Sequence, residues 1–151
     1  MKKILLISDT HGYIGDEILK HVIWSDEVWH AGDIGSLEVT DTIKNYKPLR
    51  AVHGNIDDTN IKAEFPLNQR FTVEGVEVWI RHIGGYPKRY SKNIFDEINK
   101  NPPDLFICGH SHILKVIQDR KNNLLHMNPG ACGTKGFHKF SSGQIEISNT
   151  T

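Results

Sequence analysis

A short apolar block at the start of the chain constrains the fold more than any other feature of the sequence. Residues 4–7, Ile-Leu-Leu-Ile, form a continuous hydrophobic run, which is the pattern of a strand buried on both faces of a sheet. Asp9, His11 and Gly12 follow directly. In open α/β sheets, ligands bind at the carboxyl ends of the strands. The sequence therefore places a carboxylate and an imidazole, a pair that suits a divalent transition metal, where a binding site is expected.

The first half of the chain alternates strands with helices. Apolar residues recur at helical spacing at positions 14, 18, 22 and 23, and Ser36 is placed to cap a second helix. Residues 60–66 show no periodicity and are predicted to form a loop. The predicted order is a strand at 4–7, a helix at 14–24, a strand at 27–31, a helix at 37–46 and a strand at 49–53. This order implies parallel strands joined by right-handed crossovers.

The second half has a more antiparallel character. Glu74-Gly75 is a plausible hairpin turn between strands at 70–73 and 76–83, and the second of these runs into His82. Asn128-Pro129-Gly130 is predicted to be a tight loop, and a last pair of strands is predicted to close around Ser142-Gly143. Between them we expect a helix at 91–100 and strands at 104–108, 114–119 and 124–127. We expect an α/β fold in a single domain spanning residues 1–151.

The composition favours a protein of the cytoplasm without a polyanionic partner. The chain has 18 basic and 18 acidic residues, so no net charge favours nucleic acid or an anionic membrane. No apolar stretch is long enough to span a bilayer, and the charged Asp9 follows Lys3 too closely for a signal peptide. Cys108 and Cys132 resemble neither a disulfide framework nor a zinc knuckle. We interpret them as reduced thiols.

Five predicted strand ends carry ligand-type side chains. Every one of them offers oxygen or nitrogen and none a thiolate, which suits manganese, iron, zinc or nickel better than calcium or an iron–sulfur cluster. Seven ligands are too many for one tetrahedral ion but suffice for two divalent ions if Asp33, in the middle of the set, bridges them. Two ions roughly 3.5–4 Å apart are standard for phosphate-ester hydrolysis. The predicted ligands are Asp9, His11, Asp33, Asn55, His82, His110 and His112.

Each of these residues also has a purely structural interpretation. Asp9 and Asp33 could cap the helices that follow them, and Asn55 could be a turn residue. His110 and His112 could be histidines whose nitrogens are bonded to the backbone. Capping and turns do not require such residues at five strand ends together, so the set favours a metal site.

The ordered blocks Asp-x-His, Gly-Asp, Gly-Asn, His-Gly and Gly-His-x-His resemble the signature of the calcineurin-like metallophosphoesterases. Segments 8–12, 30–33 and 128–130 look most like the small prokaryotic phosphodiesterase branch of that family. The resemblance implies a sandwich of two mixed β-sheets flanked by helices. It also implies two metal ions, with manganese favoured. Asp9, His11, Asp33 and His112 would bind the first ion, and Asp33, Asn55, His82 and His110 the second.

The chain departs from the family pattern at two places. Ile56 follows Asn55 where larger relatives have a histidine that protonates the leaving group or stabilises the transition state, and an aliphatic side chain cannot transfer a proton. In the fourth block, Ile83 stands between His82 and the pair Gly84-Gly85, where the family more often has glycine directly after the histidine.

These observations predict a dinuclear metal-dependent phosphoesterase. Its substrates would be phosphodiesters or small phosphomonoesters, attacked by water that the two cations activate. Asp33 and Asn55 are the predicted catalytic residues, with the Asn55 amide facing the charge that develops on phosphorus. The alternative is a catalytically weak protein-binding scaffold of the same fold, like the retromer subunit. Ile56 is the residue that keeps this alternative open. A nuclease is disfavoured because no basic stripe is present. Because small relatives of this family often assemble, a homo-oligomer is an alternative to a monomer.

Overall fold

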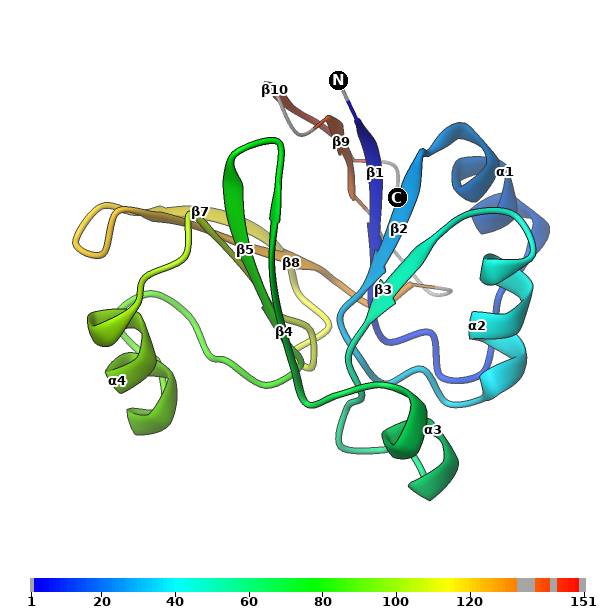
Figure 1. Cartoon of the computed structure of the whole chain (residues 1–151), viewed down its shortest axis with the longest axis horizontal. Coiled ribbons are helices and arrows are strands. Elements are labelled where there is room, and N and C mark those ends of the chain that lie inside the picture. Colours follow the sequence, from blue (N-terminus) through cyan, green and yellow to red (C-terminus); the bar gives the residue numbers. More distant parts are fainter. Residues whose placement is uncertain (1, 133–137, 142–143, 150–151) are drawn as a thin grey trace.

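The computed structural model describes residues 2–132, 138–141 and 144–149. Strands and helices alternate through the first half and strands dominate the second (Figure 1). The elements are β1 (Lys3–Ile7), α1 (Asp16–Trp24), β2 (Glu27–His30), α2 (Leu37–Lys44), β3 (Leu49–Ala51), α3 (Thr59–Glu64), β4 (Asn68–Val73), β5 (Val76–Arg81), α4 (Lys92–Lys100), β6 (Leu105–Ile107), β7 (Leu114–Asp119), β8 (Leu124–Pro129), β9 (His138–Ser141) and β10 (Gln144–Asn149).

The strands form two mixed sheets of five. The first has the order β10-β9-β1-β2-β3 and the second the order β4-β5-β6-β8-β7. In the first sheet β1, β2 and β3 are parallel, and β9 and β10 are antiparallel additions. In the second, β5, β6 and β8 are parallel and the edge strands β4 and β7 are antiparallel. The predicted two-sheet α/β architecture is therefore confirmed.

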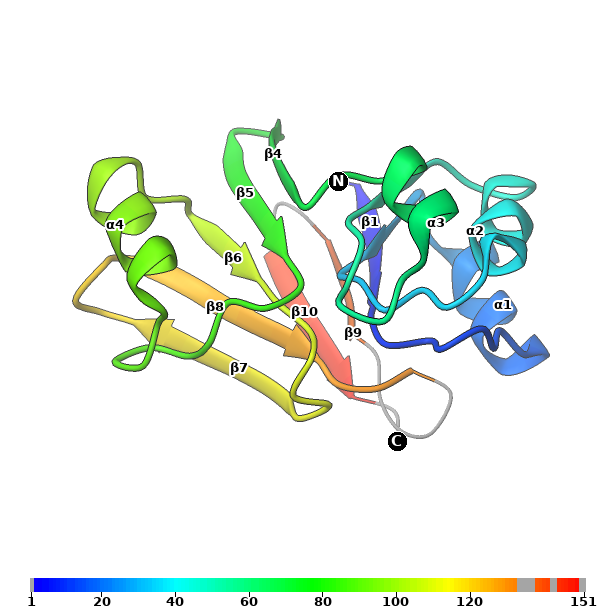
Figure 2. The ribbon, with the colours of Figure 1, turned by 90° about the horizontal axis from the view of Figure 1, so that it is seen from below.

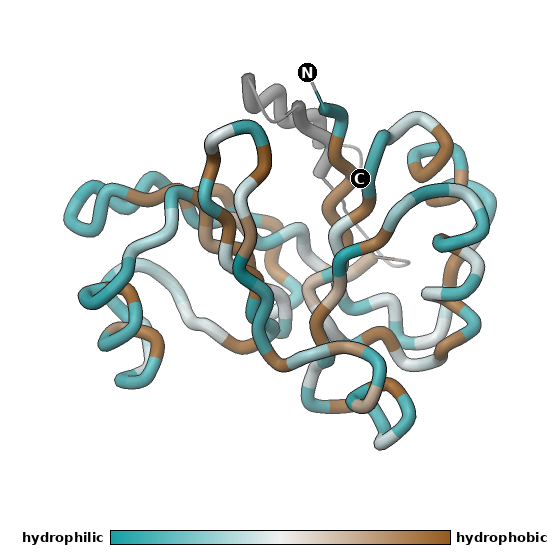
Figure 3. The backbone as a smooth tube through the Cα atoms, viewed as in Figure 1, coloured by the Kyte–Doolittle hydropathy of each residue, from teal (hydrophilic) through white to brown (hydrophobic). Residues whose placement is uncertain are grey.

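Alternation along β1 explains how the two sheets pack. Ile4 and Leu6 point into a core shared with the second sheet, where they meet Val78, Ile80 and Ile107. Burying such side chains is the main source of stability in a sandwich of this kind. Figure 3 shows apolar segments along the strands of both sheets.

The helices cover the outer faces of the sheets. Leu5 and Ile7, the alternate residues of β1, pack against α1 and α2 on one side of the molecule, and α4 covers the opposite side (Figure 2). In α1 the predicted apolar face is confirmed for Ile18 and Val22, whereas Ile23 lies off that face and is 56% exposed. In the part of the chain that the structure describes, no helix is long and apolar enough to cross a bilayer.

The loop predicted at residues 60–66 is wrong, because α3 spans Thr59–Glu64. The Asp58 side chain accepts a hydrogen bond from the Ile61 backbone amide at 3.0 Å and so caps the first turn. Ile61 is the one buried residue of this helix. Six residues with a single buried side chain give no detectable periodicity, which is why the sequence pattern missed the helix.

The tight loop predicted at 128–130 is also wrong in part, since Asn128 and Pro129 belong to β8. Pro129 pairs with Leu114 of β7, while the pairing of β8 with β6 ends at Met127. A proline without an amide hydrogen is tolerated there because no strand on the β6 side requires its donor. The predicted turn at Ser142-Gly143 lies outside the described residues, although β9 and β10 on either side of it pair as expected.

The other predicted elements are confirmed with ends shifted by about one or two residues, as is usual at element termini. One shift affects the site. β5 ends at Arg81, so His82 does not lie within the strand. It follows the strand, just as the other predicted ligands follow theirs.

His126 of β8 gives the fold a measurable pH dependence. It is fully buried among Tyr86, Tyr90 and Phe106, and neither ring nitrogen has a hydrogen-bond partner in the described part of the chain. Burial lowers the pKa of His126 to about 4; nearby Asp119 raises it and Lys115 lowers it further. Between pH 6.5 and 4, therefore, the unfolded chain binds a proton at this residue and the folded chain does not.

We expect the free energy of unfolding to fall by about 3 kcal/mol through His126 as pH drops from 6.5 to 4. Urea unfolding of the wild type and of His126→Met at several pH values measures this contribution. His30, whose pKa burial also lowers to about 4, is present in both proteins, so the difference isolates His126. Parallel stability curves for the two proteins would contradict the prediction.

Candidate metal centre

All seven predicted ligands lie in loops that directly follow strands. Asp9 and His11 come after β1, Asp33 after β2 and Asn55 after β3, all in the first sheet. His82 comes after β5, and His110 and His112 come after β6, both in the second sheet. The parallel strands of both sheets end at the same side of the sandwich, which is the lower edge in Figure 1. The structure thus brings together residues from both halves of the chain.

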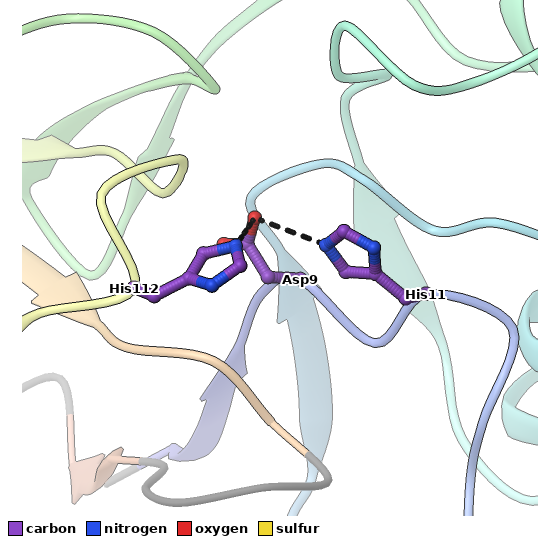
Figure 4. Close-up of side chains that lie close together, drawn as sticks. All are labelled: Asp9, His11 and His112. Atoms are coloured by element: carbon purple, nitrogen blue, oxygen red, sulfur yellow. Dashed lines mark ion pairs between the residues drawn. The ribbon is translucent and has the colours of Figure 1, made fainter.

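Asp9, His11 and His112 form one group of converging ligand atoms. Asp9 Oδ1 lies 3.2 Å from His112 Nε2 and 3.7 Å from His11 Nε2. Figure 4 shows the two imidazoles on either side of the carboxylate, each with a nitrogen directed toward it. One ligand atom from each residue lies within 4.8 Å of the others. The carboxylate is buried and both imidazoles are exposed, so a solvent-derived ligand has access to this group.

Asp33, His82 and His110 form a second such group, again with ligand atoms within 4.8 Å of one another. Asp33 Oδ1 lies 3.2 Å from His82 Nε2, and Asp33 Oδ2 lies 3.7 Å from His11 Nε2 of the first group. The two oxygens of Asp33 therefore face different groups, which is the position that a bridging carboxylate requires.

Asn55 joins the second group through His110. Its side-chain Oδ1 lies 3.0 Å from His110 Nδ1. Because a carbonyl oxygen can only accept, His110 Nδ1 carries the proton and Nε2 keeps a free lone pair. Ile56, the next residue, donates its backbone amide to Asp33 Oδ1 at 3.1 Å, and its side chain is 47% exposed.

Two buried polar atoms at the centre of the site have no hydrogen-bond partner among the described residues: Asp9 Oδ1 and His82 Nε2. His82 Nδ1 lies 2.7 Å from the Ala31 carbonyl, so it donates there and Nε2 presents a lone pair. That lone pair faces the oxygens of Asp9 and Asp33 at 3.8 and 3.2 Å. Buried acceptors facing one another are costly unless a cation lies between them, so the residues present fit divalent metal ions.

The remaining oxygen of Asp9 is fixed by the protein. Asp9 Oδ2 accepts hydrogen bonds from Ser8 Oγ at 2.6 Å and from the His110 backbone amide at 3.1 Å. The second bond joins residues 101 positions apart in the chain and links the end of β1 to the loop after β6. Oriented in this way, the carboxylate directs Oδ1 into the site.

Five of the seven residues have a left-handed backbone, which non-glycine residues rarely adopt. Such conformations cost of order 1–3 kcal/mol each and are concentrated at functional sites, where the surroundings enforce them. Their φ values range from 49° to 72°, and the residues are Asp9, His11, Asp33, His110 and His112.

Glycine at position 54 makes room for Asp33. A Cβ atom on Gly54 would lie 2.0 Å from Asp33 Oδ1 and 2.4 Å from its backbone nitrogen. We expect Gly54→Ala to displace Asp33 and to weaken Mn²⁺ binding by about 10- to 100-fold, the range found when a ligand loses its orientation. Metal titration followed by thermal shift measures this effect. Gly75→Ala, in a hairpin turn with nothing within 4 Å of the added atom, is the control, and equal Mn²⁺ affinity in both variants would contradict the prediction.

Sequence reasoning missed Asp57, which connects two of the ligand loops. This buried carboxylate accepts hydrogen bonds from the backbone amides of Ile34, Gly35 and Gly54 at 3.1, 2.8 and 2.7 Å. These amides adjoin Asp33 on one side and Asn55 on the other. An aspartate two residues after Asn55 was the signal available in the sequence, but nothing there indicated which groups it would contact.

His30 and Asn128 also hold the ligand loops in place. His30 Nδ1 accepts from the Gly32 amide at 3.1 Å, and His30 Nε2 lies 2.9 Å from Thr10 Oγ1. Burial lowers the pKa of His30 to about 4, so the ring is neutral, as this pair of contacts requires. Asn128 Nδ2 donates to the Gly109 carbonyl at 2.9 Å, beside His110.

Comparison with known sequences agrees with this arrangement. A model of the calcineurin-like phosphoesterase superfamily domain matches residues 1–150. The chain is 31% identical over 121 residues to a probable metallophosphoesterase of Mycoplasma pneumoniae, an alignment that covers 75% of this chain and 69% of the relative. It is 27% identical over 147 residues to a probable metallophosphoesterase of Methanocaldococcus jannaschii, covering 90% and 73% of the two chains.

Comparison with solved structures supports the same fold. A Thermotoga maritima protein superposes with a TM-score of 0.79 at 25% identity over 100% of this chain and 99% of its own. Vps29 from Cryptosporidium parvum gives 0.72 at 18% identity, covering 99% and 96%. An archaeal phosphodiesterase gives 0.67 at 22% identity, covering 98% of each chain. The last two likenesses concern the fold alone.

Proposed function

Because this chain belongs to the calcineurin-like phosphoesterase superfamily, we propose that it is a dinuclear metal-dependent hydrolase of phosphodiesters or small phosphomonoesters. The single observation that carries the proposal is the position of Asp33, whose two oxygens face His11 at 3.7 Å and His82 at 3.2 Å. A carboxylate whose two oxygens face different imidazole groups is suited to two cations.

In this proposal all seven residues are ligands. Asp9, His11, Asp33 and His112 would hold one ion, and Asp33, Asn55, His82 and His110 the other. Manganese is favoured, and iron, zinc and nickel suit the same donor set. When bound, such ions supply a water nucleophile at neutral pH and neutralise charge on the phosphoryl oxygens.

The chain's own residues orient the substrate and hold protons in place. The amide of Asn55, exposed beside His110, is placed to contact a phosphoryl oxygen as charge develops on it. His82 Nδ1 donates its proton in a hydrogen bond to the Ala31 carbonyl. This bond excludes His82 as a proton donor to the leaving group. The cavity of about 500 Å³ beside His11, Tyr13 and His112 is large enough for the organic part of a small ester.

Ile56 predicts a preference among substrates. It occupies the position after Asn55, and its aliphatic side chain has no acidic proton to transfer. General acid catalysis typically supplies about 10²- to 10⁴-fold, and a leaving group that is stable as an anion does not need it. We therefore propose that esters of nitrophenol react much faster than alkyl esters of the same phosphate.

The test is metal analysis combined with a phosphoester panel. Protein stripped with EDTA is reloaded with Mn²⁺, its metal content is measured, and bis-p-nitrophenyl phosphate, p-nitrophenyl phosphate and an alkyl phosphodiester are supplied. Two ions per chain with metal-dependent release of nitrophenol support the proposal. Bound metal without turnover of any ester would overturn it and favour a protein-binding scaffold.

A further inference from the structure

A second cavity adjoins the metal centre on the side of Asn55 and His82. It has a volume of about 230 Å³, and both of these predicted ligands line it. Lys62 of α3 and Arg81 at the end of β5 contribute two positive charges, and none of the described residues that line the cavity is an aspartate or glutamate. Its remaining walls include Leu67 and Ile83, which are 46% and 48% exposed.

Arg81 is unusual among the arginines of this chain. The other two half-buried arginines have carboxylate partners: Arg50 Nε contacts Glu27 Oε1, and Arg70 contacts Glu77 at 3.5 Å and Glu97 at 3.7 Å. Arg81 forms no ion pair within 4.0 Å with any described residue. Within the part of the chain that the structure describes, its Nη1 reaches a single neutral acceptor, Asn68 Oδ1, at 3.3 Å, and its buried Nε has no partner.

The acceptor on Asn68 is itself shared, because the same Oδ1 also accepts from Trp79 Nε1 at 3.1 Å. Arg81 lies between this cavity and a neighbouring one that Asn68, Trp79 and Glu97 line, and its half-buried guanidinium has no carboxylate within 4.0 Å among the described residues. Partly desolvating a charge without a counter-ion costs free energy. A bound anion would remove that cost.

Lys62 adds a second charge from a different element. Within the described chain its ammonium has no carboxylate within 4.0 Å, whereas Lys44 nearby contacts Glu64 of the same helix α3. Lys62 also lies on the helix that Asp58 caps, so its backbone position is fixed.

The cavity on the opposite side of the centre has a different character. It is lined by Asp9, Thr10, His11, Tyr13, His112, Ala131 and Cys132. Neither lysine nor arginine is among these residues. Among the described residues, therefore, the first cavity offers two cations, whereas this one offers the aromatic ring of Tyr13, two imidazoles and the carboxylate of Asp9.

We propose that the cavity beside Asn55 and His82 binds a second anionic group of the substrate, with Arg81 and Lys62 as specificity-determining residues. This inference rests on the proposed function. The chemical class is a phosphoester that carries a carboxylate or a further phosphate on one of its ester groups. Arg81 recognises such a group through its planar fork of donors and Lys62 as a point charge. Leu67 and Ile83 contact the apolar linker between the anion and the reacting phosphorus.

Two phosphodiesters that differ at one para position, nitro in one and carboxylate in the other, test the proposal. Bis-p-nitrophenyl phosphate and p-nitrophenyl 4-carboxyphenyl phosphate release the same nitrophenolate. We expect kcat/KM of the Mn²⁺-loaded wild type to be about tenfold higher for the second ester, because one hydrogen bond to a charged group contributes enough free energy for a change of that size. Arg81→Gln and Lys62→Gln should each reduce this preference several-fold through KM, and Arg81→Lys should keep part of it. Arg89→Gln and Lys20→Gln, at exposed positions, are the matched controls.

Equal kcat/KM for the two esters in the wild type would overturn the inference. So would an Arg81→Gln variant that retains the full preference. A further readout separates this result from failure of the proposed function. If neither ester is hydrolysed, titration with 4-carboxyphenyl phosphate should still shift the Arg81 Nε–H signal in NMR spectra and leave that of Arg89 in place. Absence of that shift overturns the anion site, whereas its presence supports the site even though the proposed hydrolase activity has failed.

Discussion

Replacing Asp33 with alanine is expected to lower the metal-dependent hydrolysis of bis-p-nitrophenyl phosphate by at least about a thousandfold, because the variant loses the carboxylate whose two oxygens face different imidazole groups. Asp33 Oδ1 and Oδ2 lie 3.2 and 3.7 Å from His82 and His11, so its removal affects both proposed ions at once. A bound cation contributes several kcal/mol of transition-state stabilisation, and each 1.36 kcal/mol corresponds to about a tenfold change in rate. Steady-state kinetics at saturating Mn²⁺ measure the effect.

Asp16→Ala, in the exposed first turn of α1, is the control, because it removes a carboxylate that does not belong to the proposed metal centre. It should leave turnover unchanged. An Asp33→Ala variant that retains more than about a tenth of the wild-type rate would show that the two groups of ligands do not act as one centre.

The same substitution should not destabilise the metal-free protein. Asp9 and Asp33 are each 2% exposed, and their oxygens converge on the same imidazoles. Without a cation, buried carboxylates this close disfavour one another. We therefore expect metal-free Asp33→Ala to melt no earlier than metal-free wild type, and its melting temperature to lose the rise with Mn²⁺ that ligand binding produces. Loss of activity together with loss of fold would contradict this interpretation.

The positions of the candidate ligands could be predicted because each depends on a short local pattern. An apolar run such as residues 4–7 marks a strand, and a polar residue directly after it marks that strand's end. Parallel strands place such ends on one side of a sheet. This reasoning brought Asp9 and Asp33 of the first sheet together before their geometry was known, whereas His110, which follows a strand of the second sheet, was grouped with them by the family resemblance.

Features that depend on contacts between distant loops could not be predicted in this way. α3 was missed because one buried residue, Ile61, gives no periodicity. The left-handed backbone of His11 and His112 leaves no trace in residue type, since histidine has no intrinsic preference for that conformation as strong as that of glycine. The partner of Arg81 could not be foreseen either, because the predicted hairpin strand began at residue 70, whereas β4 extends to Asn68, which lies opposite Arg81.

Asp57 is the residue whose loss is expected to cost most in stability. Its carboxylate accepts three backbone hydrogen bonds, and each buried donor left unpaired costs about 1–3 kcal/mol. We expect Asp57→Ala to lower the free energy of unfolding by about 4 kcal/mol and the melting temperature by about 10 °C, as measured by urea and thermal unfolding. Asp57→Asn should lose less, because its amide oxygen can still accept from Gly54 and Ile34. Asp58→Ala, which removes a single capping bond in α3, should cost only about 1 kcal/mol. Equal losses at positions 57 and 58 would mean that Asp57 does not connect the two ligand loops, because a residue that joins them must matter more than one that caps a single helix.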